Sequence, residues 1–390
     1  MKKKLLYIST RYPYDNSFSG DRQRTIESIN FFSKYYDVIL VCLGNKNYIQ
    51  ETKLKKSIKI IIFEQNFISK IFFSFISILK NKPIQFGFFF SSKLKSYIQL
   101  NAYKFDIIIF NTIRTCQYLP TNYSGVKYLD MIDLISSNYY QTYKKLNLIN
   151  PLKYIYLYEY KKIFDYEKKI QNYFKKIFLV SKKDLKLASQ FINSKKLIFL
   201  PMGINKVKNI FKYNKKNNKI IFIGNLKYLP NMHACLNFIK EILPILVDND
   251  NKILFYIIGE INFIDKVKIN ILTNKYKNNI KVLGKINNLE KYIKKSFCAI
   301  CNTEIASGFQ TKILTYMSYG IPSIVSRNTM VDKKIINRKN ILSFKNNKQF
   351  INLILELKNN KTLADKISKN GIELMEKNFF WNKVFKNKFK

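Results

Sequence analysis

Residues 304–326 have the sequence EIASGFQTKILTYMSYGIPSIVS, and this stretch decides the fold class. It follows an apolar run that ends near Cys301, and its Ala-Ser-Gly turn leads into a helical pattern that Gly320 ends. Pro322 then introduces a second apolar run at 323–325. A strand, a helix and another strand in direct succession are typical of a parallel sheet with a helical crossover.

The same alternation extends outward in both directions from this stretch. Helices are predicted near 21–33, 232–246, 309–319 and 349–357. Strands are predicted at 4–9, 37–43, 58–63, 105–110, 126–129, 176–180, 197–200, 220–223, 253–258, 280–283, 297–301 and 323–325. We therefore expect an α/β protein with two Rossmann-like domains, whose parallel sheets face each other across a cleft.

A polar, basic stretch without periodicity, residues 201–219, separates the two series of elements. We predict an N-terminal domain over 1–203, a linker over 204–218 and a C-terminal domain over 219–377. A helix near 378–390 is expected to pack back on the first domain.

The chain of 390 residues is strongly basic, with 69 Lys and Arg against 25 Asp and Glu. Such a balance usually indicates nucleic acid or an anionic membrane as a partner. Nearly all of the positive charge is Lys, spread over the chain together with abundant Asn and Ile, as an AT-rich coding sequence produces. This spread argues against a nucleic-acid binder, which concentrates its charge in one stripe. It also makes the six Arg residues informative, since Arg was kept where Lys comes easily.

Cysteine usage and the N-terminus favour a cytoplasmic protein. An odd, sparse set of five Cys fits a reducing compartment. The single C-x-x-C, Cys298 and Cys301, lies in an apolar run and is interpreted as part of a buried strand rather than a metal site. The apolar run at the N-terminus stops at Ser9 and is predicted to be a first strand, not an export signal. No apolar stretch reaches the length of a membrane span.

The turn before the helix near 309–319 is a candidate phosphate site. Gly308 precedes the helix and Lys312 lies in its first turn. The free N–H groups and positive dipole end of a helix start favour a diphosphate, and Lys312 adds a charge for a departing phosphate. An ordinary strand–helix turn with a solvated Lys is the alternative.

Two further candidates follow strands of the first half. Gly20 opens a helix that carries Asp21, Arg22 and Arg24, and the alternative is a capped helix with exposed charges. Asp133 follows a strand in LDMIDLISSNYY, residues 129–140. Its carboxylate is expected either to hold an acceptor hydroxyl and act as a base, or to cap the next helix.

These segments, in this order, resemble a GT-B glycosyltransferase of the family 4 type, also called group 1. The resemblance is to bacterial sugar transferases of exopolysaccharide clusters. RYPYDNSFSGDRQRTIESINFF is similar to the opening of that group, PMGIN to the step before its linker, and IFIGNLKYLPNMHACLNF to the start of its second domain. GFQTKILTYMSYGIPSIVS resembles its donor-binding motif, and the likeness extends over roughly the whole chain.

The resemblance implies transfer of a sugar from a nucleoside-diphosphate sugar to an acceptor, with retention of configuration and without a metal or other cofactor. The residues that it implies for donor binding lie in both domains: Gly20, Asp21, Arg24, Gly224, Asn225, Ser307, Gly308, Gln310, Lys312 and Thr315. Together with their positions in the sequence, it makes Asp133 and Lys312 the predicted catalytic residues. The expected acceptor is a glycan or lipid-linked saccharide of surface polysaccharide synthesis.

One departure from the family pattern is Thr315, where the family usually has a Glu that holds the donor ribose. Thr offers one hydrogen bond and no bidentate acceptance. This difference keeps open a degenerate, non-catalytic relative. A nucleotide-sugar epimerase of the same fold is a further alternative, but such enzymes use His in the cleft, and the only His is His233, predicted near a helix start.

The apolar, aromatic stretch 67–95 is flanked by Lys residues. We expect either peripheral docking on an anionic membrane at the inner face of the cytoplasmic membrane, or a core helix followed by a loop.

Overall fold

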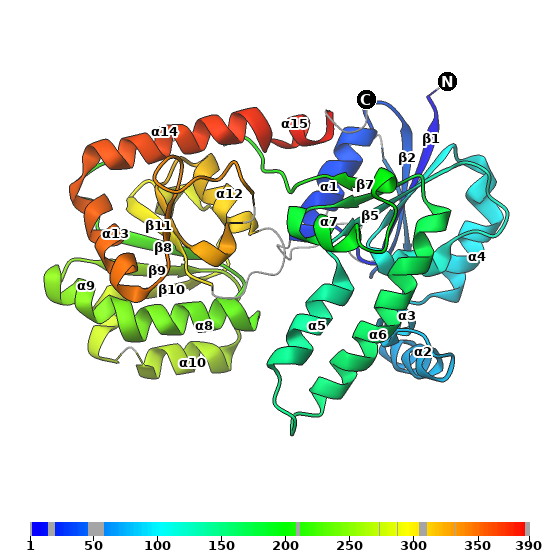
Figure 1. The fold of residues 1–390 in the computed structure, drawn as a ribbon, viewed down its shortest axis with the longest axis horizontal. Helices are drawn as coiled ribbons and strands as arrows, with labels where there is room; N and C mark the ends of the chain where they lie inside the picture. Colours follow the sequence, from blue (N-terminus) through cyan, green and yellow to red (C-terminus); the bar gives the residue numbers. More distant parts are fainter. Residues whose placement is uncertain are drawn as a thin grey trace. The chain divides into compact units, whose positions relative to one another are not determined.

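The computed structural model describes residues 2–14, 20–45, 58–207, 211–272, 274–286, 288–303, 310–330 and 332–386. The chain divides into two compact units, with the boundary between Pro201 and Met202. Each unit is a parallel sheet with helices on both faces (Figure 1). The predicted α/β class with two Rossmann-like halves is confirmed, whereas the cleft between them stays a prediction.

In the described part of the chain, the first unit holds a seven-stranded sheet in the order β3-β2-β1-β4-β5-β6-β7. Its strands are β1 (Lys4–Ser9), β2 (Asp37–Leu43), β3 (Lys59–Phe63), β4 (Ile107–Asn111), β5 (Val126–Ile132), β6 (Lys176–Leu179) and β7 (Leu197–Phe199). Its helices are α1 (Gly20–Phe32), α2 (Phe67–Leu79), α3 (Ile84–Phe88), α4 (Ser92–Asn101), α5 (Ile135–Lys145), α6 (Leu152–Ile170) and α7 (Lys182–Ala188).

The second unit holds a six-stranded sheet among its described residues, in the order β10-β9-β8-β11-β12-β13. Its strands are β8 (Lys219–Ile223), β9 (Leu254–Ile258), β10 (Ile280–Gly284), β11 (Ser296–Cys301), β12 (Ser323–Ser326) and β13 (Leu342–Phe344). Its helices are α8 (Leu229–Asn237), α9 (Leu243–Asn249), α10 (Phe263–Leu272), α11 (Glu290–Ile293), α12 (Thr311–Ser318), α13 (Asn347–Asn359) and α14 (Lys361–Asn378).

Both sheets are buried on both faces, as the continuous apolar runs require. In β1, Leu6 and Ile8 belong to one core cluster, whereas Leu5 and Tyr7 belong to the cluster on the opposite face. Cys298 and Cys301 are buried and free in β11, as expected for a strand rather than a metal site.

Several elements differ from the sequence prediction, among them the helix expected at 232–246 and the strand β13. The helix expected at 232–246 is interrupted by a π-helical turn at Phe238–Ile242, just before Pro244. Proline lacks the N–H that an α-helix needs at this point, so the hydrogen-bonding pattern shifts. The strand β13 was not predicted, because three residues after a long loop give no periodic pattern.

The last described helix, α15 (Trp381–Lys386), crosses the boundary between the units. Phe385 groups with the first unit, where its ring stacks on Phe31 of α1 with centroids 5.2 Å apart. The expected linker, 204–218, groups with the second unit, and its residue Phe211 is buried.

Candidate active site

Glycines end three neighbouring strands of the second sheet. Gly224 follows β8, Gly259 follows β9 and Gly284 ends β10. Gly259 has φ +146°, and a Cβ atom there would lie 1.9 Å from the carbonyl oxygen of Gly224. Gly284 has φ +66° with open space around it. The carboxyl edge of this sheet therefore turns tightly, in conformations that only glycine adopts without strain.

Lys312 lies next to this edge, in the first turn of α12. Its Nζ donates to Oδ1 of Asn231 at 2.7 Å and lies 4.4 Å from the centre of the Phe222 ring. Asn231 in turn donates through Nδ2 to the backbone oxygen of Asn225 at 2.9 Å. A Cβ atom on Gly224 would lie 3.1 Å from the same Nζ. Lys312, Asn231 and Gly224 therefore form one compact group.

Among the described residues, no acidic side chain pairs with the charge of Lys312. The side chain is 9% exposed. Burial lowers its pKa from the ordinary value, because the charged form loses hydration. Within the described part of the chain, the contacts of this ammonium are a neutral amide and an aromatic ring, and a nearly buried ammonium of this kind gains most from a bound anion.

Tyr316 fixes the helix that carries Lys312. It lies one turn further along α12 and is fully buried. Its hydroxyl donates to the carbonyl oxygen of Ile300 in β11 at 3.1 Å and accepts from the backbone N–H of Ile223 in β8 at 2.8 Å. One phenol thus ties the helix start to the ends of two strands. This role was not predictable from the sequence, because an aromatic residue on a helix is usually only part of the core.

The other predicted donor residues have mixed positions. Gln310 is the N-cap residue of α12 and makes no side-chain cap hydrogen bond. Thr315 is half-buried, and its hydroxyl donates to the carbonyl oxygen of Thr311 at 3.2 Å. Asn225 is exposed after β8. Ser307 and Gly308 lie outside the described residues, and all these donor contacts stay predictions.

In the first unit, Arg24 is fully buried and engaged by the protein. Its Nε and Nη2 donate to the two carboxylate oxygens of Asp130 at 2.7 and 2.8 Å. Its Nη1 donates to the backbone oxygens of Leu200 and Pro201, both at 3.1 Å. Arg24 therefore joins α1 to β5 and to the chain after β7, so any effect on donor phosphates would be indirect.

Asp133 follows a strained turn at the end of β5. Ile132 has φ +68°, and the N–H of Asp133 donates to the carbonyl oxygen of Met131 at 2.9 Å, which closes a γ-turn. This conformation costs a β-branched residue about 1–3 kcal/mol, and such strain concentrates at functional sites. The turn also shifts the register between β5 and β6.

The carboxyl group of Asp133 holds its proton unusually well. Burial and the neighbouring Asp184 raise its pKa from 3.8 to about 7, while Arg24 opposes the shift. Its Oδ1 has no hydrogen-bond partner within the described structure. Burial likewise raises the pKa of Asp184, in α7, to about 6 and that of Glu167, in α6, to about 7. A carboxylate with a pKa near neutrality and a free oxygen can accept a proton from an acceptor hydroxyl.

The neighbouring strand β4 ends with a second strained residue, Thr112. It has φ +67°, and its N–H donates to the carbonyl oxygen of Asp130 at 2.8 Å. Its hydroxyl is buried without a partner among the described residues. Free hydrogen-bonding capacity thus occurs at the ends of both β4 and β5. Sequence analysis missed Thr112 because positive φ at threonine contradicts its propensity.

Gly20 and Asp21 begin α1, as predicted. Asp21 forms an ion pair with Arg11 at 3.4 Å. Arg11 and Arg114 both lie over the ring of Phe89, at 5.9 and 5.1 Å from its centre. The scarcity of arginine could have identified both residues, but the sequence analysis used it only for α1.

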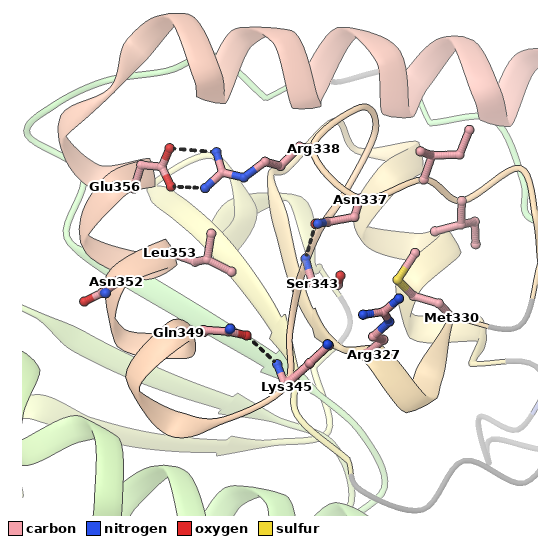
Figure 2. Close-up of a pocket in the computed structure, with 12 residues that line it drawn as sticks. Arg327, Met330, Asn337, Arg338, Ser343, Lys345, Gln349, Asn352, Leu353 and Glu356 are labelled. Carbon is pink, nitrogen blue, oxygen red and sulfur yellow. Dashed lines mark hydrogen bonds and ion pairs between the residues drawn. The ribbon is translucent and has the colours of Figure 1, made fainter.

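A separate pocket of about 630 Å³ lies in the second unit, beside β13 and α13 (Figure 2). Arg338 closes one side through two hydrogen bonds to Glu356, at 3.1 and 3.0 Å. Asn337 accepts from the N–H of Ser343 at 2.8 Å. Lys312 does not line this pocket. We therefore assign the pocket no part in the site around Lys312.

Among the described residues no group of three or more His, Cys, Asp or Glu side chains could hold a metal ion. Nor is any described helix both long and apolar enough to span a bilayer. His233 is exposed on α8.

Residues 217–360, all within the second unit, match the family model of the group 1 glycosyl transferases. The second unit therefore carries the sequence pattern of the group 1 glycosyl transferases. The matched range contains the strand-end glycines, Lys312 and Tyr316. No curated protein has a significant sequence match to the chain.

Solved structures resemble this chain over nearly its full length. HepE from Anabaena, in complex with UDP, is 11% identical with a TM-score of 0.70, and 98% of each chain is covered. Sucrose-phosphate synthase from Thermosynechococcus elongatus is 11% identical with a TM-score of 0.72, covering 98% of this chain and 96% of that one. A glycosyltransferase from Rickettsia africae is 13% identical with a TM-score of 0.66, covering 99% of this chain and 96% of that one. At these identities the likeness establishes the GT-B fold.

Proposed function

We propose that this glycosyltransferase moves a sugar from a nucleoside-diphosphate sugar to a hydroxyl of a glycan or lipid-linked acceptor. The observation that carries the proposal is the nearly buried Lys312, which has no carboxylate partner among the described residues and lies beside the glycine turns of its sheet. A diphosphate supplies the anion that this ammonium lacks. In proteins of similar fold, HepE is found with such a donor, UDP-glucose, and TarM with the nucleoside diphosphate UDP.

In the proposed reaction, the bond from the anomeric carbon to the diphosphate oxygen breaks as the acceptor oxygen attacks that carbon. Lys312, with Gly224 and the start of α12 at Gln310, stabilises the charge that develops on the diphosphate. Asp133 holds the acceptor hydroxyl and takes its proton. We propose retention of configuration and no requirement for a metal or other cofactor, because basic groups and helix N–H groups replace the cation.

The proposed setting is the cytoplasm and the synthesis of surface polysaccharide or glycoconjugate. A lipopolysaccharide outer core galactosyltransferase, WaaB, has the same fold at 13% identity and a TM-score of 0.59, covering 98% of this chain and 97% of that one. This likeness makes lipid-linked saccharides sensible acceptors to test first.

A non-catalytic relative is the second candidate, favoured by Thr315. Its hydroxyl already donates to Thr311 within α12, so it is a poor substitute for a glutamate that holds the donor ribose. The epimerase alternative would require a histidine in the site. His233 is the chain's only histidine, and it is exposed on α8.

The test is release of nucleoside diphosphate from a panel of nucleotide sugars, each with and without a chelator. UDP-sugars are tried first. Turnover of one donor that survives the chelator and rises with added acceptor saccharide supports transfer without metal. If donors bind but no saccharide or water accepts the sugar, the non-catalytic relative is the better description.

A further inference from the structure

Helix α2 presents its apolar side to water. Seven of its large apolar residues are each between 43% and 77% exposed, whereas Ser77 is its buried residue. The seven are Phe67, Ile68, Ile71, Phe72, Phe75, Ile78 and Leu79. They recur at helical spacing and form one continuous face. A surface helix normally turns such a face toward the core, so the core-helix interpretation of this stretch is wrong.

Helix α2 is held firmly in place although its apolar side is exposed. A Cβ atom on Gly87 of α3 would lie 2.0 Å from the backbone oxygen of Phe73, so the two helices touch backbone to backbone. Phe73 also packs edge-on against Phe90, with ring centres 4.8 Å apart. Asn66 caps the helix start by accepting from the N–H of Ser69 at 2.7 Å. The apolar face is therefore fixed in place on a rigid support.

The connection between α5 and α6 carries a second exposed apolar group. The group consists of Leu148 and Ile149 in the connection and Leu152, Tyr154 and Ile155 at the start of α6, and each is 47% to 95% exposed. These residues form the α5–α6 tip. Helix α6 is fastened to the segment after α2, because Tyr158 donates to the backbone oxygen of Lys82 at 3.1 Å and Glu159 accepts from Gln85 at 2.7 Å. Figure 1 shows α2 and this hairpin tip at the same end of the first unit.

Both exposed groups lie in runs of sequence without acidic residues. Residues 65–105 contain six Lys and no Asp or Glu, and residues 134–158 contain three Lys and no Asp or Glu. Asp and Glu number 25 in the whole chain, so these two runs depart from the rest. Apolar side chains bordered by lysine alone are complementary to a surface that combines hydrocarbon with negative charge. A second copy of the chain would bring like charges together instead.

We propose that α2 and the α5–α6 tip together dock the first unit on an anionic lipid bilayer. The aromatic and aliphatic side chains enter the boundary between headgroups and acyl chains, with α2 lying in the membrane plane. Lys70, Lys80, Lys82 and Lys153 meet the lipid phosphates. This inference concerns the position of the enzyme and holds whatever donor or acceptor it uses.

The experiment is sedimentation of the full chain with vesicles of phosphatidylcholine alone or mixed with phosphatidylglycerol. We expect binding to the mixed vesicles that weakens steeply with salt, and little binding to phosphatidylcholine alone. The double variant Phe72→Ser, Phe75→Ser should bind at least tenfold more weakly, because it removes two exposed aromatic side chains that would leave water on entering the bilayer. The matched control is Phe263→Ser, which removes a phenylalanine that is 81% exposed on α10 of the second unit.

Two charge-reversal variants measure the electrostatic contribution to membrane binding. Lys70→Glu with Lys82→Glu should lower binding to anionic vesicles several-fold, whereas Lys266→Glu on α10 should leave it unchanged. Absence of vesicle binding by the natural chain, or equal binding by the Phe72, Phe75 variant, overturns the proposal. So does a concentration-dependent dimer that the same variant abolishes, because the face would then bind a second copy.

Discussion

The carboxyl edges of the two sheets share a topology but carry opposite chemistry. The edge of the second sheet turns on Gly224 and Gly259 without backbone strain and holds the ammonium of Lys312, which has no carboxylate partner among the described residues. The edge of the first sheet turns on strained Ile132 and gathers carboxyl groups whose pKa values are raised. A parallel sheet thus supplies a place for chemistry, while a few side chains decide whether that place attracts an anion or accepts a proton.

The largest expected effect comes from Lys312→Met, which keeps the apolar stem and removes the charge. We expect kcat/KM for the donor to fall about 10³-fold, because one preorganised donor to a departing oxyanion contributes this much. Lys227→Met is the matched control, since Lys227 also follows β8 but is exposed and pairs with Glu260 at 3.3 Å. Steady-state kinetics of both variants decide the question, and equal losses would contradict the assignment.

Asp133→Asn tests the opposite edge. We expect kcat to fall about 10²-fold or more with the donor KM unchanged, because the amide cannot take a proton. In the natural enzyme, activity should rise with pH through an apparent pKa near 7. Asp184→Asn should move that limb to lower pH, since the charge of Asp184 helps to raise the pKa of Asp133. An unchanged pH profile in Asp184→Asn would show that the charge of Asp184 does not influence the pKa of Asp133.

Two glycine substitutions at the carboxyl edge of the second sheet distinguish steric overlap from the cost of a positive φ. Gly259→Ala should destabilise the protein by about 2 kcal/mol or more, because the new Cβ atom would overlap the backbone oxygen of Gly224 at a strained φ. Gly284→Ala faces open space and should cost about 1 kcal/mol from φ alone. Denaturant unfolding of both variants measures the difference, and similar losses would show that contact at Gly259 is unimportant.

The pH dependence of stability is a further comparison of the two edges. Asp133, Asp184 and Glu167 have pKa values raised above their unfolded values, so the stability linked to their protons is complete near pH 4 and is lost as pH rises through about 6 to 7. Asp133→Asn should therefore flatten the fall in unfolding free energy between pH 5 and 7, by at most about 1.4 kcal/mol per pH unit. Urea unfolding at several pH values would reveal an unchanged slope if the carboxyl group titrates normally.

Much of the fold was predictable because apolar runs and glycines are local signals. β1 and β2 match their predicted bounds, and the glycines after β8 and β9 lie where a strand–helix turn needs them. The site was predictable only in part. Lys312 and Asp133 follow from position, whereas the γ-turn at Ile132 contradicts the propensity of isoleucine, and the Tyr316 bridge joins groups distant in sequence. The outward apolar face of α2 was ambiguous, since periodicity shows that a helix has a face but not what that face meets.

The central claim is that the donor diphosphate depends on Lys312 and not on Asp133. The most direct test is isothermal titration calorimetry with UDP, without added metal. It is carried out on the natural chain, on Lys312→Met and on Asp133→Asn. The account predicts saturable binding by the natural chain and by Asp133→Asn, and loss of binding in Lys312→Met with its fold intact by circular dichroism. Unchanged affinity in Lys312→Met, or loss in Asp133→Asn alone, would contradict it.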